Sequence, residues 1–133
     1  GSRSVAVGQQ EMQVSMSGCE AQGHLLAIAR LPLPPGATAQ QAAQAAKQWQ
    51  EAALANFKGQ ITDTHVLLIK SKDAPNPGPL QRISATGTGP DGKPMQSQMV
   101  WLVHEGHIIQ AVVYAPKLSA EVTDTFFAGL ELP

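Results

Sequence analysis

"MQSQMVWLVHEGHIIQAVVYA", residues 95–115, is the stretch that decides the fold class. Two runs rich in β-branched and aromatic residues flank the pair Glu105–Gly106, and such runs favour β-strands. A two-residue connection containing glycine is typical of a β-hairpin. The sequence therefore predicts two antiparallel strands whose closing pair is His104 and His107.

The first of these runs is apolar on both faces. Met99 and Trp101 lie on one face of the predicted strand, and Val100 and Leu102 lie on the other. A strand that is buried on both faces needs cover on each side of its sheet. We therefore expect helices over parts of both faces.

The stretch "TAQQAAQAAKQWQEAALANFKG", residues 38–59, predicts one long helix. Thr38 and Gln41 have the spacing of a capping box, and Gly59 is expected to adopt the left-handed conformation that ends many helices. The helical period gives one face of small and aromatic residues, which is expected to pack on the sheet. This buried stripe comprises Ala42, Ala46, Trp49, Ala53 and Phe57, whereas Gln44, Lys47, Gln48 and Glu51 are expected to lie outside.

The rest of the chain completes an α+β pattern. Residues 11–31 predict a hairpin, and the proline-rich segment 71–79 predicts an irregular, mobile loop. A short C-terminal helix is expected to begin with a Ser119 cap and to end at Gly129, with Val122 and Phe126 on one face. The order is hairpin, long helix, four consecutive strands and short helix. We therefore predict a single domain over residues 1–133 with a central antiparallel sheet of about six strands, flanked by the two helices.

The charge distribution argues against nucleic acid as a partner. The chain has 9 Lys+Arg and 10 Asp+Glu, and its basic residues are scattered along the sequence. Neutralising a phosphate backbone requires clustered cations. No stretch approaches the roughly 20 apolar residues of a membrane-spanning helix, so no transmembrane segment is expected in this chain.

Compartment is suggested only indirectly. Residues 1–2, Gly-Ser, look like a cloning remnant, with any targeting segment already removed. Cys19 is the single cysteine and is expected to be a small residue in a loop, without an internal disulfide. Its surroundings superficially resemble a lipoprotein attachment site, but the preceding "VGQQEMQV" is too polar for a signal peptide, so we reject that interpretation.

The candidate site residues are His104 and His107, with Trp101 on the same strand as a further candidate for ligand contact. Two histidines at the end of a hairpin could share a metal ion, but a zinc site usually needs three or four protein ligands. A third ligand would have to be His24 or His65. We prefer a hairpin corner to a metal site here. No catalytic residue, metal ligand or cofactor is predicted.

Motifs of nucleophilic catalysis and phosphate binding are not found in the sequence. It contains no G-x-S-x-G elbow and no glycine loop that leads from a strand into a helix. The glycine-rich "TGTGPDG" joins two predicted strands, so it is expected to be a hairpin loop. Triads assembled in space remain open at this point.

Four segments together resemble the PsbP-like, or DcrB-like, domains of the bacterial extracytoplasmic type. They are "LPLPPGAT" before the helix, "ANFKGQI" at its end, "VHEGHIIQAVVYAP" in the hairpin and "DTFFAGLEL" at the C-terminus. The resemblance covers most of residues 11–132. It departs from the family pattern at His107, where arginine is common, at Ile109, where an aromatic is common, and at Ala128–Gly129, where Ser-Phe is usual.

The resemblance implies a helix-flanked antiparallel sheet in a periplasmic, secreted or lipoprotein-type setting, with a lipid anchor on a removed N-terminal segment as one option. The family includes photosystem II extrinsic subunits, a Ran-binding branch and chaperones of secretion systems. It shares no catalytic residue set, so none is carried over.

Three hypotheses about function follow. The first is a non-catalytic extracytoplasmic accessory domain that binds a protein or a small molecule. The second is a chaperone-like module that shelters apolar segments of a secreted partner, which would need a large exposed apolar patch. The third is a metal-dependent hydrolase that uses His104 and His107.

Overall fold

The computed structural model describes residues 2–7, 10–67, 70–71, 80–89, 91–104, 106–129 and 131–132. Strands and helices follow one another in the order that the sequence predicts, with three strands in addition: β1, β5 and β9. The elements are β1 (Ser2–Val7), β2 (Gln10–Ala21), β3 (His24–Pro32), α1 (Ala39–Phe57), β4 (Gln60–Leu67), β5 (Lys70–Ser71), β6 (Leu80–Thr88), β7 (Pro94–His104), β8 (His107–Ala115), α2 (Ala120–Ala128) and β9 (Glu131–Leu132).

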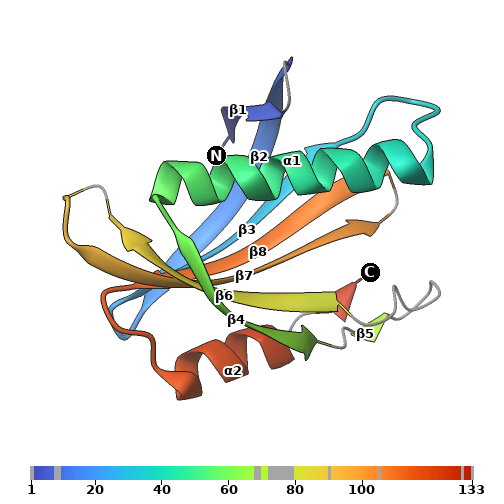
Figure 1. Cartoon of the computed structure of the whole chain (residues 1–133). Coiled ribbons are helices and arrows are strands. Elements are labelled where there is room, and N and C mark those ends of the chain that lie inside the picture. Colours follow the sequence, from blue (N-terminus) through green and yellow to red (C-terminus); the bar gives the residue numbers. More distant parts are fainter. Residues whose placement is uncertain are drawn as a thin grey trace.

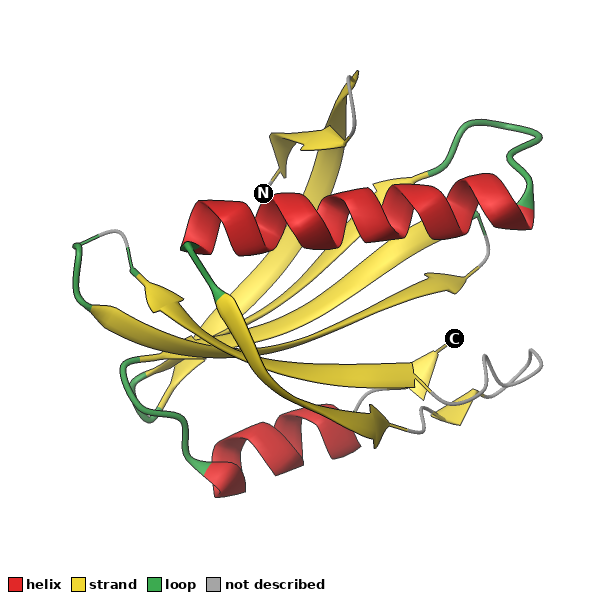
Figure 2. Ribbon diagram, viewed as in Figure 1, coloured by secondary structure: helices red, strands yellow, loops and turns green. Residues whose placement is uncertain are grey.

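One antiparallel sheet forms the centre of the fold (Figures 1 and 2). Its seven strands have the order β1-β2-β3-β8-β7-β6-β4, so the N-terminal hairpin joins the later strands through β3 and β8. The predicted α+β class, the antiparallel sheet and the two flanking helices are confirmed. A two-stranded parallel pair of β5 and β9 was not predicted. It brings together two-residue segments far apart in sequence, for which no local pattern exists.

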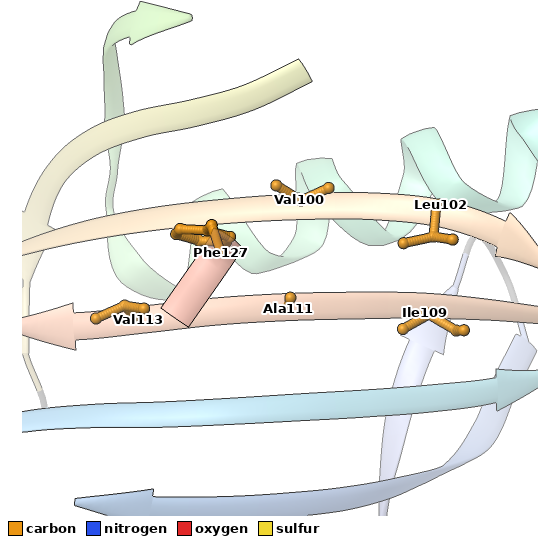
Figure 3. Packing of buried hydrophobic residues seen from close by; sticks show 6 residues of the cluster. All are labelled: Val100, Leu102, Ile109, Ala111, Val113 and Phe127. Atoms are coloured by element: carbon orange, nitrogen blue, oxygen red, sulfur yellow. The ribbon is translucent and has the colours of Figure 1, made fainter. Parts of the chain in front are cut away.

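The two helices cover opposite faces of the sheet, as Figure 1 shows. Against α1 pack two clusters of buried residues that include Trp49, Ile108 and Met99. On the other face, Phe127 of α2 packs on Val100 and its neighbours (Figure 3). The double-sided burial predicted for β7 is therefore confirmed.

The beginning of α1 matches the prediction, but its end does not. Thr38 and Gln41 form the capping box, with Gln41 N donating to Thr38 Oγ1 over 3.1 Å and Thr38 N donating to Gln41 Oε1 over 2.9 Å. The left-handed residue at the C-terminus is Lys58, with φ of 53°, and not Gly59. The N–H groups of Lys58 and Gly59 donate to Ala55 O and Leu54 O, which places Lys58 at the left-handed position of a Schellman motif.

Gly59 is needed for a different reason, which is space around Phe57. A Cβ on Gly59 would lie 2.7 Å from Phe57 Cδ1, and a Cβ on Gly87 of β6 would collide with the Phe57 carbonyl oxygen. Two glycines thus let the end of α1 approach the sheet closely. Phe57 is buried as a result.

Of two local predictions about polar residues, one is wrong and the other is confirmed in position only. Cys19 lies in strand β2, where it pairs with Leu26, and not in a loop; the connection is the shorter turn at Gln22–Gly23. Ser119 occupies the N-cap position of α2, but its hydroxyl makes no capping hydrogen bond. On α2 itself the fully buried aromatic is Phe127, whereas Phe126 is half-buried.

The predicted loop at 71–79 is mostly outside the described residues, since only Ser71 is described and it belongs to β5. The turn predicted after β6 is confirmed, with Gly92 at φ 79° and a hydrogen bond of 2.9 Å from Gly89 N to Lys93 O. Among the described residues, no helix is long and apolar enough to span a membrane.

Candidate functional site

The predicted histidine pair is the closing pair of the β7–β8 hairpin. His104 and His107 are partners in the strand register, and Gly106 has a φ of 77°. The Gly106 carbonyl accepts a hydrogen bond of 2.8 Å from Leu33 N, which ties the turn to the chain leaving β3. Glu105 and the side chain of His104 are outside what the structure describes.

Neither of the other histidines lies near this pair. His107 pairs with Pro32 at one end of β3, whereas His24 begins β3 at its other end. His65 is on the edge strand β4, where its imidazole contacts Asp63 at 3.0 Å in an exposed pair. In the described part of the chain, no three His, Cys, Asp or Glu side chains gather as metal ligands.

Trp101 lies in the core beneath α1. It is half-buried, and its ring meets that of Trp49 edge to face, with centroids 6.5 Å apart. Its indole nitrogen Nε1 is buried without a hydrogen-bond partner. A buried indole N–H normally has an acceptor, so a buried Trp101 N–H without one is unusual.

A pocket of about 630 Å³ opens between the C-terminal half of α1 and the sheet. This volume falls in the range typical of sites for small organic ligands. Residues of α1, β2, β3, β6, β7 and β8 line the pocket, so segments that are far apart in the sequence meet there. It is lined by Glu20, Gly23, His24, Leu25, Ala53, Phe57, Thr88, Gly89, Met95, Gln110, Tyr114, Ala115 and Pro116.

Aromatic and aliphatic groups form most of the pocket wall. The rings of Phe57 and Tyr114 meet edge to face with their centroids 5.5 Å apart. Leu25 is the register partner of Tyr114 and is 46% exposed, so it marks the rim. Ala53 and Met95 add small and flexible apolar surface. Such a wall suits an apolar ligand.

Gln110 is one of two buried polar residues that line this pocket, the other being His24. Its side chain is only 3% exposed, although both neighbours along β8 are buried hydrophobic residues. Trp101 lies directly opposite Gln110 on β7. In the sequence, Gln110 is visible only as the single glutamine inside the apolar run "HIIQAVVYA", and it was not predicted as a site residue.

The ionisable groups of the pocket are few. Among the described residues that line it, Glu20 carries a carboxyl group, His24 an imidazole and Tyr114 a phenol, and Glu20 is exposed. His24 is buried and engaged on both ring nitrogens: Nδ1 donates to Gln22 O at 2.9 Å, and Nε2 accepts from Ser119 N at 2.9 Å. The imidazole therefore holds two segments together rather than facing a ligand.

A second, polar cleft of about 510 Å³ lies on the opposite face, beside α2. Its central side chain is Arg82, whose Nε donates to Gln98 Oε1 over 2.8 Å. Nη2 donates to Thr123 Oγ1 over 3.1 Å and to Asp124 Oδ1 over 2.8 Å, and the guanidinium lies over the Phe127 ring at 4.6 Å. These contacts fasten α2 to the sheet, so we assign Arg82 a structural role.

Comparisons with known proteins identify no family for this chain. No family model and no curated protein matches the chain. Among solved structures, it is similar to the crystal structure of a protein of unknown function, PA94 from Pseudomonas aeruginosa. The TM-score is 0.47 and the identity 8%, covering 86% of this chain and 82% of that chain.

Proposed function

We propose that this chain is a non-catalytic binding domain that takes a small, largely apolar molecule into the pocket beneath α1. The observation that carries the proposal is the pocket itself, with its volume of about 630 Å³, its apolar wall and the buried Gln110 side chain, in addition to His24, whose ring nitrogens already have partners. Pockets of this size and composition are the usual form of a small-molecule site. Binding would stabilise the domain by linkage, because the unfolded chain has no such pocket.

A pair of matched substitutions on α1 tests the proposal. Ala53 lines the pocket, whereas Ala55, two residues further along the helix, is exposed. We would titrate each variant with anilinonaphthalene, an uncharged dye that fluoresces in apolar surroundings. Ala53→Phe should weaken saturable binding by about tenfold or more, equal to a loss of roughly 1.4 kcal/mol. Ala55→Phe should bind as the wild type does.

Two outcomes would count against this site. If the wild type shows no saturable dye binding, the pocket does not serve as a binding site for apolar molecules. If Ala53→Phe and Ala55→Phe bind equally well, the dye occupies a different surface. Thermal unfolding of both variants without dye checks that the added ring has not changed the fold.

The extracytoplasmic part of the proposal depends on the resemblance of four sequence segments to PsbP-like domains. A periplasmic, secreted or lipid-anchored location is therefore proposed with the binding role. Fractionation of the native cells with an antibody against the domain tests it. Recovery of the protein in the cytosol would contradict the proposed location and leave the proposed binding role of the pocket unaffected.

A second candidate function is the chaperone-like role, because large apolar side chains are exposed on the sheet face that carries α1. Strand register places four on this face: Leu25, Ile61, Val66 and Val103, which are 46%, 51%, 72% and 41% exposed. In this role the domain would keep an apolar helical peptide in solution, as light scattering would show. Replacing Ile61 and Val66 by serine should abolish that effect, while Ala53→Phe should leave it intact.

A further inference from the structure

We infer that the ligand of the α1 pocket is an uncharged molecule with an apolar body and a hydrogen-bond acceptor, such as a carbonyl oxygen, directed at the sheet. This inference rests on the proposed function and adds the chemical class of the ligand. Two independent observations carry it: the charges around the pocket and an unpaired donor, Trp101 Nε1, on the residue opposite the lining residue Gln110.

The charges around the pocket disfavour an anion. No lysine or arginine is among the described residues that line it, and the carboxylate at its rim belongs to Glu20. An anionic group that leaves water for an apolar cavity loses its hydration and needs a cation in return. Lys58 and Lys117 adjoin the lining residues Phe57 and Pro116 in sequence, but both lysines are exposed and neither is a lining residue. A carboxylate or sulfonate would therefore enter without a partner.

Two unpaired polar atoms belong to the strand next to the pocket. On β7, Trp101 Nε1 and Ser97 Oγ are both buried, and neither has a hydrogen-bond partner among the described residues. Their register partners on β8 are Gln110 and Tyr114, and both of these line the pocket. Directly opposite residues in an antiparallel sheet share a face and have Cβ atoms roughly 5 Å apart. Neither Trp101 nor Ser97 lines this pocket itself, and Ser97 lines the polar cleft beside α2 instead. Trp101 therefore adjoins the pocket only through its partner Gln110, which lines it.

The chemistry of these atoms selects an acceptor. An indole N–H can only donate, so the partner that Trp101 lacks is an acceptor. A buried donor without a partner carries a desolvation cost, which a ligand oxygen would remove. The Gln110 carboxamide can donate to the same oxygen. A carbonyl, ester or amide oxygen accepts a hydrogen bond and carries no charge. A fatty-acid carboxylate also accepts a hydrogen bond, but it carries the charge that the pocket disfavours.

The charge preference is tested with two dyes that share one body. Anilinonaphthalene is neutral, and its sulfonated derivative differs only by the anionic group. We expect the neutral dye to bind the wild type about tenfold more tightly or better. Glu20→Lys should narrow this gap several-fold by placing a cation at the rim. Glu51→Lys, the same change on an exposed position of α1 outside the pocket lining, should leave the gap unchanged.

The acceptor preference is tested with an acyl-aminonaphthalene dye, whose emission shifts to the red when its carbonyl accepts a hydrogen bond. Trp101→Phe keeps an aromatic ring in the core and removes the donor. We expect this variant to bind the acyl dye several-fold more weakly and to lose the red shift. Binding of anilinonaphthalene, which has no carbonyl, should be unchanged and thereby shows that the pocket is intact.

Each outcome bears on one level of the proposal. Equal binding of the neutral and sulfonated dyes, or tighter binding of the sulfonated one, overturns the uncharged class and leaves the pocket as a binding site. An acyl dye that is indifferent to Trp101→Phe overturns the assignment of the acceptor. If no dye binds the wild type saturably, the proposed function fails, and the inference fails with it.

Discussion

The imidazole of His24 accepts a hydrogen bond at Nε2 from the main-chain N–H of Ser119, a residue 95 positions later in the chain. Its Nδ1 donates to Gln22 O in the turn between β2 and β3. Because a main-chain N–H can only donate, Nε2 must be unprotonated in this arrangement, and the hydrogen is on Nδ1. One buried side chain therefore ties the N-terminal hairpin to the beginning of α2.

Removing this imidazole should destabilise the domain. We expect His24→Ala to lower the free energy of unfolding by about 1–3 kcal/mol, because the partly buried Ser119 N–H loses its acceptor. His65→Ala is the control, since that histidine is exposed and its loss should change stability by less than about 0.5 kcal/mol. Urea unfolding of both variants gives the comparison, and equal losses would contradict the role assigned to His24.

Trp49 should be the most costly residue to truncate on α1. It is 1% exposed and packs against Trp101 and the buried residues of β3 and β8. Trp49→Ala is expected to cost about 3–5 kcal/mol, as large aromatic truncations in a core do. The exposed Lys47→Ala serves as control. A loss below about 1 kcal/mol for Trp49→Ala would show that this face of α1 is not buried.

The end of α1 offers a substitution that should stabilise. Lys58 has a φ of 53°, a conformation that costs an ordinary residue about 1 kcal/mol and glycine much less. Lys58→Gly should therefore raise the free energy of unfolding by roughly 0.5–1 kcal/mol, after the greater chain entropy of glycine is counted. Gly59→Ala should lower it by about 1–3 kcal/mol, because the added methyl group meets the Phe57 ring. Thermal unfolding measures both changes. If Lys58→Gly destabilises the domain and Gly59→Ala does not, then Lys58 is not the left-handed residue.

The turn between β7 and β8 should tolerate loss of a histidine better than loss of its glycine. Gly106 has a φ of 77°, which a β-branched residue adopts only at a cost of about 1–2 kcal/mol or more. His107 is exposed, so His107→Ala should cost less than Gly106→Val. Chemical denaturation of the two variants provides the measurement. A larger loss for His107→Ala would point to a structural role for the imidazole.

Zinc titration separates the hairpin corner from a metal site. We expect no change in the thermal unfolding of the wild type when zinc is added, because His24 and His65 lie away from His107. A true site would stabilise the domain by about 2.7 kcal/mol at a hundredfold excess over the dissociation constant. A shift of that size in the wild type that disappears in His107→Ala would establish the metal site.

The parts of the fold that could be predicted are those with a local physical signal. The β7–β8 hairpin has its glycine turn and its β-branched strands within 21 consecutive residues. The start of α1 was predicted because Thr38 and Gln41 cap it within one turn. Lys58 could not be predicted as the left-handed residue, since Gly59 is required by the positions of the Phe57 and Leu54 side chains, which are fixed only when the end of α1 packs on the sheet.

The pocket could not be predicted for the same reason. Its wall combines Leu25, Phe57, Met95 and Tyr114, which come from four elements and meet only through tertiary packing. The histidines attracted attention because they are close in sequence, whereas Gln110 gave a weaker signal as one polar residue in an apolar strand. Its burial, at 3% exposure, is a property of the assembled sheet.

The pairing of β3 with β8 also determines the order in which parts of the domain can fold. Among the described ladders it alone connects β1, β2 and β3 to the other strands of the seven-stranded sheet, from Leu25–Tyr114 to Pro32–His107. Hairpins close within microseconds because their ends are near, whereas strands this distant in the chain must first overcome the entropy of closing a long loop. Leu25 and Tyr114 face each other across this seam at the rim of the pocket, so the cavity is complete only once the slowest contact has formed. A nascent or partly folded chain in which the strands on each side of this ladder have paired, but β3 and β8 have not, would therefore be unable to retain a ligand.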